Sequence, residues 1–366
     1  MMRFIAVSGF LGAGKTTTLV AAAAALQARG RRVAVVTNDQ GADLVDTKLL
    51  RSSLDAVAEV SGGCFCCRFE DLMSVVERLL LAGDVDTVIA EAVGSCTDLQ
   101  ATVVRPLRKY HGDRFTVAPL ATVVDPLRLR AFARAAERGE PESDLSYLFG
   151  RQIAEADIIA VNKMDMVSPA ELDGVLARLR AVHPAATVVG YSARSGAGLP
   201  ELLEAWDKEP SWAEDLSIDY DRYAAAEAQL AWLNQDFVLE AAGGPFSPVR
   251  WGRAVLTHLA EAARRDGAEI GHAKLTVETA AGMTKMSVTG TGTDPSVDLA
   301  VDEPAAEGRA VVNARVAVEP EALDAAVLAA VAHADATAGA RSVAADASSF
   351  KPGYPRPVHR LAASDV

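Results

Sequence analysis

Residues 9–17 read Gly-Phe-Leu-Gly-Ala-Gly-Lys-Thr-Thr and match the pattern Gly-x-x-x-x-Gly-Lys-Thr. The stretch follows a short apolar run at 3–8 and begins an alanine-rich run at 15–28, which we predict as a strand and a helix. Glycines in such a turn let backbone N–H groups face phosphates, and the helix N-terminus adds partial positive charge. A plain glycine-rich turn is the alternative, but the context favours a phosphate-binding loop (P-loop).

Two side chains of this loop have predicted roles. Lys15 is expected to reach the terminal phosphates of a nucleotide, and the Thr16 hydroxyl to ligate Mg²⁺. The other predicted nucleotide contacts in the loop are Gly9, Gly12, Ala13, Gly14 and Thr17.

The residues that select the base are predicted at 162–165, which read Asn-Lys-Met-Asp after the apolar run 158–161. The Asp165 carboxylate can accept hydrogen bonds from N1–H and the 2-amino group of guanine, whereas adenine would leave it unpaired. The Lys163 stem can pack along the base, and Ser192-Ala193 can support its carbonyl. A polar loop at the start of a helix is the alternative. Together with the P-loop, the pattern predicts GTP rather than ATP.

Two acidic residues follow predicted strands at the same sheet edge as the P-loop. We interpret Glu91 as a residue that holds water around Mg²⁺ or orients the attacking water, and Asp39 as a switch residue. The backbone N–H of Gly94 is a candidate donor to the γ-phosphate. The alternative for both acids is a solvated charge at a strand end.

Strand-like and helix-like runs alternate from residue 3 to about 208, which predicts an α/β fold with a mainly parallel sheet and helices on both faces. The predicted strands of this part are 3–8, 33–36, 86–90, 117–124, 157–161 and 187–191. The predicted helices are 15–28, 70–81, 126–138, 147–155, 169–182 and 200–206.

The organisation changes after this part. We predict a P-loop GTPase domain at 1–208, an acidic linker at 209–225 and a smaller α+β domain at 226–340 with a ferredoxin-like layout. The proline-rich end, 341–366, is predicted to be extended. Two interpretations remain for that tail: a strap that lies on its own domain, or a docking peptide.

Composition limits the kinds of partner. The sequence has 49 acidic and 36 basic residues, a net charge of −13, which disfavours nucleic acid and anionic membrane surfaces. No apolar run approaches the ~18 residues of a membrane span. We therefore expect a cytoplasmic protein with no nucleic-acid or membrane partner.

Three of the four cysteines are clustered in Cys64-Phe65-Cys66-Cys67. This spacing lets two or three sulfurs converge on one thiophilic ion, and the helix predicted from residue 70 is expected to lower the thiol pKa values. Zn²⁺ or Co²⁺ suits such ligands, and Ni²⁺ and Cu⁺ remain open. Cys96 is either a fourth ligand or an inert buried thiol. For the cluster itself, a structural zinc and a redox pair are the alternatives to a site that releases its metal.

Together, these segments resemble the CobW-like GTPases, relatives of the hydrogenase- and urease-maturation GTPases that deliver nickel. The resemblance covers about 3–200 and includes 8–17, Asn38-Asp39-x-Gly41, 63–67, Glu91-x-x-Gly94, 122–125 and 156–165. It implies a metallochaperone or cofactor-assembly GTPase whose metal is bound by the cysteines between switch regions. The implied partner is a client metalloenzyme or cofactor-assembly protein, with a nucleotide-dependent homodimer as one assembly that such a switch could form.

Some segments depart from that family. The first switch, 37–42, keeps a central acid in Asp39 but lacks the flanking glutamates of the family's Glu-Asn-Glu-Phe-Gly-Glu. Ser95-Cys96-Thr97-Asp98 replaces the common Ala-Asp-Pro run after Gly94. No histidine-rich loop is present, because the six histidines are scattered.

Two functional hypotheses follow. The first is a GTP-hydrolysing metallochaperone or metallocofactor-insertion factor whose cysteine site responds to the nucleotide. The second is a GTP-gated switch that docks to a client enzyme while its cysteines hold a structural zinc. A small-molecule kinase is a third interpretation, which the predicted guanine reader disfavours.

Overall fold

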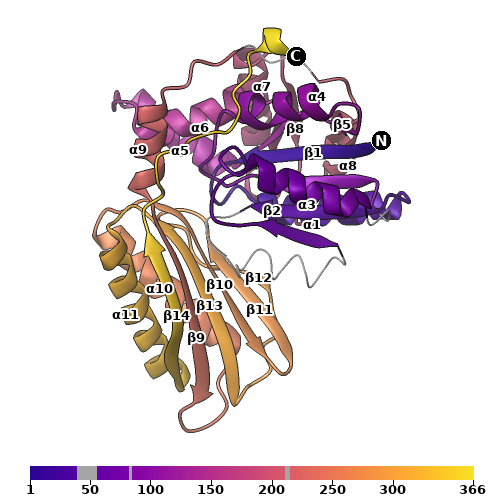
Figure 1. The fold of residues 1–366 in the computed structure, drawn as a ribbon. Helices are drawn as coiled ribbons and strands as arrows, with labels where there is room; N and C mark the ends of the chain where they lie inside the picture. Colours follow the sequence, from indigo (N-terminus) through magenta and orange to yellow (C-terminus); the bar gives the residue numbers. More distant parts are fainter. Residues whose placement is uncertain (39–55, 82–84, 211–214) are drawn as a thin grey trace. The chain divides into compact units, whose positions relative to one another are not determined.

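The computed structural model describes residues 1–38, 56–81, 85–210 and 215–366 (Figure 1). The described residues form two compact units. The parallel-sheet unit comprises the chain up to 226 together with 354–366, and the antiparallel-sheet unit comprises 227–353. Within the described parts, no helix is both long and apolar enough to cross a membrane.

The parallel-sheet unit is built on an eight-stranded sheet with the order β3-β2-β4-β1-β6-β7-β8, and β5 pairs with β1. Its pairings are all parallel, which confirms the predicted α/β class. The strands are β1 (Met2–Gly9), β2 (Val33–Asn38), β3 (Val57–Val60), β4 (Thr87–Glu91), β5 (Phe115–Val117), β6 (Ala121–Val124), β7 (Ile158–Val161) and β8 (Thr187–Gly190).

Helices cover both faces of this sheet. The helical segments are α1 (Lys15–Ala28), α3 (Phe69–Leu81), a π-helical turn (Gln100–Val104), α4 (Arg105–His111), α5 (Pro126–Glu137), α6 (Asp144–Ala154), α7 (Pro169–Val182) and α8 (Leu199–Trp206). Successive residues of β1 enter opposite cores: Phe4 packs with residues of α3 and α4, whereas Ile5 packs with α1 and α8. Because side chains alternate along a strand, the apolar run of β1 is buried on both faces.

One predicted strand of this unit is two strands. The sequence predicted a single strand at 117–124, but the structure separates β5 from β6 at residues 118–120. Pro119 lies in that break, and proline has no N–H to donate to a sheet. β5 consequently pairs with the first residues of β1, whereas β6 pairs with its last residues.

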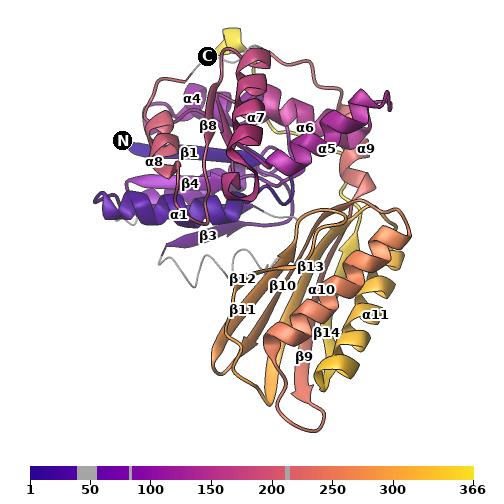
Figure 2. The ribbon, with the colours of Figure 1, turned by 180° about the vertical axis from the view of Figure 1, so that it is seen from behind.

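The antiparallel-sheet unit has six strands in the order β12-β11-β10-β13-β9-β14. Figure 2 shows α10 and α11 side by side on one face of this sheet. Removal of β11 and β12 leaves a β-α-β-β-α-β order, so the ferredoxin-like layout is extended by two strands at one edge. The elements are β9 (Ala231–Ala241), α10 (Pro248–Arg265), β10 (Ile270–Thr279), β11 (Gly282–Val288), β12 (Ser296–Leu299), β13 (Glu307–Val316), α11 (Pro320–Ala338) and β14 (Ala340–Phe350).

Two segments differ from the predicted organisation. Residues 341–350, assigned to the extended tail, form most of β14 and pair with β9. Residues 220–229, which span the end of the predicted linker and the start of a predicted strand, form α9 (Tyr220–Gln229). β14 contains few β-branched or aromatic residues, so its pairing depends on backbone hydrogen bonds to a distant strand rather than on local propensity.

A buried acid connects α6 to the loop after β4. Glu155, directly after α6, accepts hydrogen bonds from Thr97 Oγ1 and from the backbone N–H of Gln100, both at 3.1 Å. Gln100 in turn donates from Nε2 to Asp157 at 2.9 Å. Burial raises the pKa of Glu155 to about 8, because the charged carboxylate loses its hydration.

We predict that Glu155→Gln flattens the pH dependence of stability between pH 5 and 8. Above the ordinary pKa of glutamate, the unfolded chain releases the Glu155 proton while the folded chain retains it. The stability of the wild type therefore falls as pH rises through this window, by at most about 1.4 kcal/mol per pH unit. Calorimetric unfolding of the parallel-sheet unit at several pH values measures the effect. The exposed Glu137→Gln serves as the control. Parallel pH profiles for wild type and Glu155→Gln would contradict the assignment.

Candidate functional site

The loop between β1 and α1 approaches its neighbours more closely than side chains would permit. Gly9, Gly12 and Gly14 have φ values of 137°, 75° and 92°, a region that favours glycine. A Cβ on Gly9 would lie 2.3 Å from the carbonyl oxygen of Val123, and one on Gly14 would lie 2.4 Å from Asn162 Nδ2. The backbone therefore forms a cradle that only glycine can line, which fits a phosphate group.

Lys15, Thr16 and Glu91 meet at the start of α1. Thr16 Oγ1 donates to Glu91 Oε2 at 2.9 Å, and Lys15 Nζ lies 4.0 Å from Glu91 Oε1. Lys15 also donates to the carbonyl oxygen of Gly9 at 2.9 Å. All three side chains are buried. A hydroxyl beside a carboxylate is a donor set that suits Mg²⁺, and the ammonium group lies beside it.

The segment predicted to read the base, 162–165, is held against the P-loop by Asn162. Its Nδ2 donates to the carbonyl oxygen of Ala13, and its Oδ1 accepts from the backbone N–H of Ala193, both at 3.0 Å. Ser192, beside Ala193, is buried. One amide side chain thus joins the phosphate loop to the loop after β8.

Lys163 is held in a defined orientation. Its Nζ donates to the carbonyl oxygen of Gly12 and to Asp125 Oδ2, both at 2.7 Å, and its φ is 59°. Asp125, which follows β6 and caps α5, received no role of its own from the sequence. Its position directly after a buried strand, at the sheet edge that carries the P-loop, is the sequence feature that could have identified it. Asp165 lies in a 3₁₀ turn (Met164–Met166) and is exposed, as is Thr17 on α1.

Asn38, the last residue of β2, orders the cysteine segment. Its Nδ2 donates to the carbonyl oxygens of Val60 and Gly63 at 2.9 and 2.6 Å. Its Oδ1 accepts from the backbone N–H of Phe65 at 2.8 Å. Asp39, the predicted switch residue, lies outside the described residues.

The three clustered thiols converge in a turn immediately before α3. The Sγ separations are 2.8 Å for Cys64–Cys66, 3.3 Å for Cys64–Cys67 and 3.8 Å for Cys66–Cys67. A tetrahedral zinc with bonds of about 2.3 Å holds its sulfurs about 3.8 Å apart, so small side-chain rotations adapt this cluster to such an ion.

The electrostatic environment of the cluster differs from the sequence-based expectation. Hydrogen bonds with Cys64, with further contributions from Cys67, Cys96 and burial, raise the pKa of the Cys66 thiol, and the pKa of Cys67 is also raised. The expected lowering by the helix N-terminus is therefore outweighed. Because the raised pKa values favour the protonated forms of Cys66 and Cys67, metal binding by these two thiols must release protons.

The loop after β4 lies close to both sites. A Cβ on Gly94 would lie 2.9 Å from Lys15 Nζ, while the Cys96 thiol lies within hydrogen-bonding reach of Cys66. The buried Gln152 of α6 donates to the carbonyl oxygens of Gly94 and Cys96 at 3.0 and 2.7 Å. The sequence analysis did not identify Gln152, because nothing in its local pattern distinguishes it from a polar helix residue.

Comparisons with known proteins identify the family. Residues 3–190 match the family model described as CobW/HypB/UreG, nucleotide-binding domain. The zinc chaperone CobW of Pseudomonas aeruginosa is 33% identical over 54% of this chain and 58% of its own length. The zinc chaperone YeiR of Escherichia coli is 31% identical over 46% of this chain and 48% of its own. The chain thus spans about half the length of these curated relatives.

Similar solved structures include HypB from Helicobacter pylori in complex with nickel, with 18% identity, a TM-score of 0.41 and coverage of 59% of this chain and 92% of that one. Another is Zn(II)-bound YjiA GTPase from E. coli, with 15% identity, a TM-score of 0.37 and coverage of 90% and 98%. The family match spans more than half of the sequence and covers the P-loop, the cysteine cluster and residues 162–165, and on that basis the chain belongs to the CobW/HypB/UreG family of P-loop GTPases.

Proposed function

We propose that this chain is a GTP-hydrolysing metallochaperone in which the state of the nucleotide site controls the cysteine site. The observation that carries the proposal is the loop after β4. At its start, Glu91 accepts a hydrogen bond from Thr16 of the P-loop. Five residues later, Cys96 contacts the thiol of Cys66. A displacement of this short segment at the nucleotide site would therefore move Cys96 at the cysteine site directly, with no helix or strand between them.

The polar residues of the P-loop have roles that follow from their placement. Lys15 would exchange its bond to its own loop carbonyl for phosphate oxygens, and Thr16 would turn its oxygen from Glu91 to the metal ion. Glu91 is then free to accept from a water in that space. Bound Mg-GTP would place its γ-phosphate near the backbone of Gly94. Loss of that phosphate on hydrolysis would allow the Gly94 backbone to move.

The cysteine cluster is proposed as the cargo site, with Cys64, Cys66 and Cys67 as ligands and Cys96 placed to supply a fourth sulfur. Soft thiolates favour thiophilic ions, and zinc is the first candidate because several relatives are named as zinc chaperones. The cargo would pass to a client metalloenzyme or cofactor-assembly protein.

A second candidate is a GTP-gated switch whose cysteines hold a structural zinc. The observation that favours it is burial, since the side chains of Cys64, Cys66 and Cys96 are almost completely enclosed. These three buried sulfurs, with the half-buried Cys67, would make a closed site, which is typical of structural zinc. Metal that survives prolonged chelation in every nucleotide state would support this candidate over the chaperone.

The coupling predicts that zinc affinity depends on the nucleotide. We expect the dissociation constant for Zn²⁺ to differ by about fivefold or more between the chain with GDP and the chain with a non-hydrolysable GTP analogue, because coupling energies between sites are typically 1–3 kcal/mol. Competition titration with a chromogenic chelator measures it. The Cys64→Ser variant controls for zinc bound elsewhere. Equal affinities in both nucleotide states would remove the coupling, because a ligand without differential affinity shifts no equilibrium.

The fourth sulfur is tested with Co²⁺ as a spectroscopic probe. If four thiolates bind the ion, Cys96→Ser should lower the sulfur-to-cobalt charge-transfer absorption by about a quarter, because ligand number sets its intensity. Cys67→Ser should produce a loss of similar size. A Cys96→Ser spectrum that matches wild type would restrict the site to three sulfurs.

The base specificity predicts a switch of preference in Asp165→Asn. GTP affinity should fall about 10- to 100-fold and xanthosine triphosphate affinity should rise, because the amide donates where the carboxylate accepted. Asp173→Asn, an exposed acid on α7, is the matched control and should leave both affinities unchanged. Unaltered GTP binding in Asp165→Asn would show that residues 162–165 do not read the base.

A further inference from the structure

The carboxy-terminal segment 354–366, which we call the strap, runs along the cysteine segment. The backbone N–H of Arg356 donates to Cys67 Sγ at 3.2 Å, and that of Val358 donates to the carbonyl oxygen of Cys66 at 2.9 Å. Both bonds join parts of the same compact unit. One of them reaches a proposed metal ligand directly, so the strap forms part of the wall of the cysteine site.

Aromatic contacts fix the next part of the strap at the start of α3. The His359 ring lies edge-on to Phe69, with ring centroids 5.0 Å apart and planes at 89°, and its centroid is 5.3 Å from that of Tyr110. Phe69 is the first residue of α3 and is buried. The strap is therefore seated on the helix that follows the cysteines.

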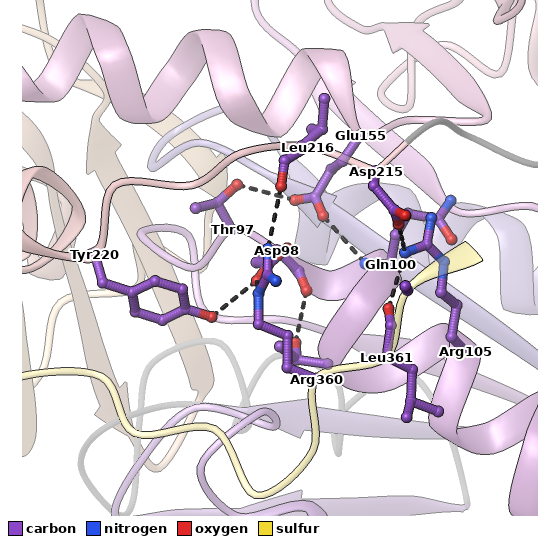
Figure 3. Close-up of polar contacts among 12 residues, drawn as sticks. Thr97, Asp98, Gln100, Arg105, Glu155, Asp215, Leu216, Tyr220, Arg360 and Leu361 are labelled. Atoms are coloured by element: carbon purple, nitrogen blue, oxygen red, sulfur yellow. Dashed lines mark hydrogen bonds and ion pairs between the residues drawn. The ribbon is translucent and has the colours of Figure 1, made fainter. Parts of the chain in front are cut away.

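An ion pair then ties the strap to the loop after β4. Arg360 Nε donates to Asp98 Oδ2 at 2.7 Å, and Tyr220 Oη donates to the same oxygen at 2.8 Å (Figure 3). Asp98 is buried and has a φ of 66°, which is uncommon for a residue other than glycine. Buried carboxylates need a partner, so the position of Arg360 depends on the position of this loop.

The residue after Arg360 is also anchored. The backbone N–H of Leu361 donates to the carbonyl oxygen of Ala101, and the Leu361 carbonyl oxygen accepts from Arg105, both at 2.9 Å. Arg105 pairs in turn with Asp215 at 2.5 Å (Figure 3). On the strap, this anchor at Leu361 follows Arg360, whereas the two bonds at the cysteines, made by Arg356 and Val358, precede it.

We propose that the strap is a lid over the Cys64, Cys66 and Cys67 site and that the Asp98–Arg360 ion pair is its latch. Asp98 is four residues after Gly94, which lies beside Lys15 in the P-loop. Movement of that loop would shift Asp98 and release the bonds that Arg356 and Val358 make with the cysteine segment. This proposal rests on the proposed function for the identity of the bound metal, whereas the enclosure of the thiols rests on the contacts of the strap itself.

The latch predicts that Arg360→Gln exposes Cys67. In the metal-free and nucleotide-free full-length chain, we expect iodoacetamide to modify Cys67 about tenfold faster than in wild type, as followed by mass spectrometry. Arg360→Lys keeps the charge and should restore a rate near that of wild type. Arg138→Gln, which breaks an exposed ion pair with Glu140, is the matched control and should have no effect.

The deeply buried Cys96 separates opening of the lid from general unfolding. If Arg360→Gln accelerates modification of Cys67 while Cys96 stays protected, the lid is supported. Equal acceleration at both cysteines would mean that the variant loosens the fold, and an unchanged rate at Cys67 would remove the latch. Either result would overturn the proposal.

Hydrogen exchange of the wild-type chain tests the link to the nucleotide without a substitution. Exchange in peptides that cover 356–361 should change at least about threefold when a non-hydrolysable GTP analogue binds. Unchanged exchange would overturn the link between the latch and the nucleotide. If zinc affinity does not respond to nucleotide but Arg360→Gln still exposes Cys67, the metallochaperone proposal fails while the lid stands.

Discussion

The functional geometry depends on the parallel pairing of β1 with β4 and β6. The register places Val7 of β1 opposite Glu91, while Gly9 at the end of β1 is opposite Val123. Since parallel strands end at the same edge of a sheet, this pairing brings the phosphate loop, the acid that follows β4 and the turn after β6 together. The strands approach so closely that position 9 requires glycine, because a Cβ there would collide with the backbone of β6.

Side-chain amides hold the loops that emerge from this edge. Asn162 joins the P-loop to the loop after β8, Asn38 organises the turn that carries the cysteines, and Gln152 fixes the backbone around Gly94 and Cys96. Each is buried and bonds to backbone groups that would otherwise lack partners away from water. A displacement of the loop after β4 must therefore break specific hydrogen bonds, which favours two discrete positions over continuous drift.

The cysteine site combines features of a closed site and of one that opens. Its sulfurs are mostly buried, and the raised pKa of Cys66 favours the neutral form of that thiol. One side of the enclosure is the strap, which is anchored by the Asp98–Arg360 ion pair, by backbone hydrogen bonds and by the ring contacts of His359. Arg360 is about half exposed, so water can reach its end of the ion pair, and Tyr220 still donates to the buried Asp98 when Arg360 leaves. A lid of this kind would keep the cysteine site closed while the ion pair is formed and would open it when the ion pair breaks.

The sequence alone predicted the α/β fold, the P-loop and the cysteine cluster, because each is recognisable from contiguous residues within a strand–loop–helix context. The assignment of residues 162–165 to base reading stays a prediction. It did not predict the break between β5 and β6, the pairing of 341–350 as β14, or the roles of Asp125 and Gln152. Arg360 and Asp98 are 262 residues apart, and the strap meets Cys67 across 289. Local propensity and spacing carry no information about such contacts. Only the folded chain, through strand register and the burial of polar groups that need partners, determined which distant residues complete the site.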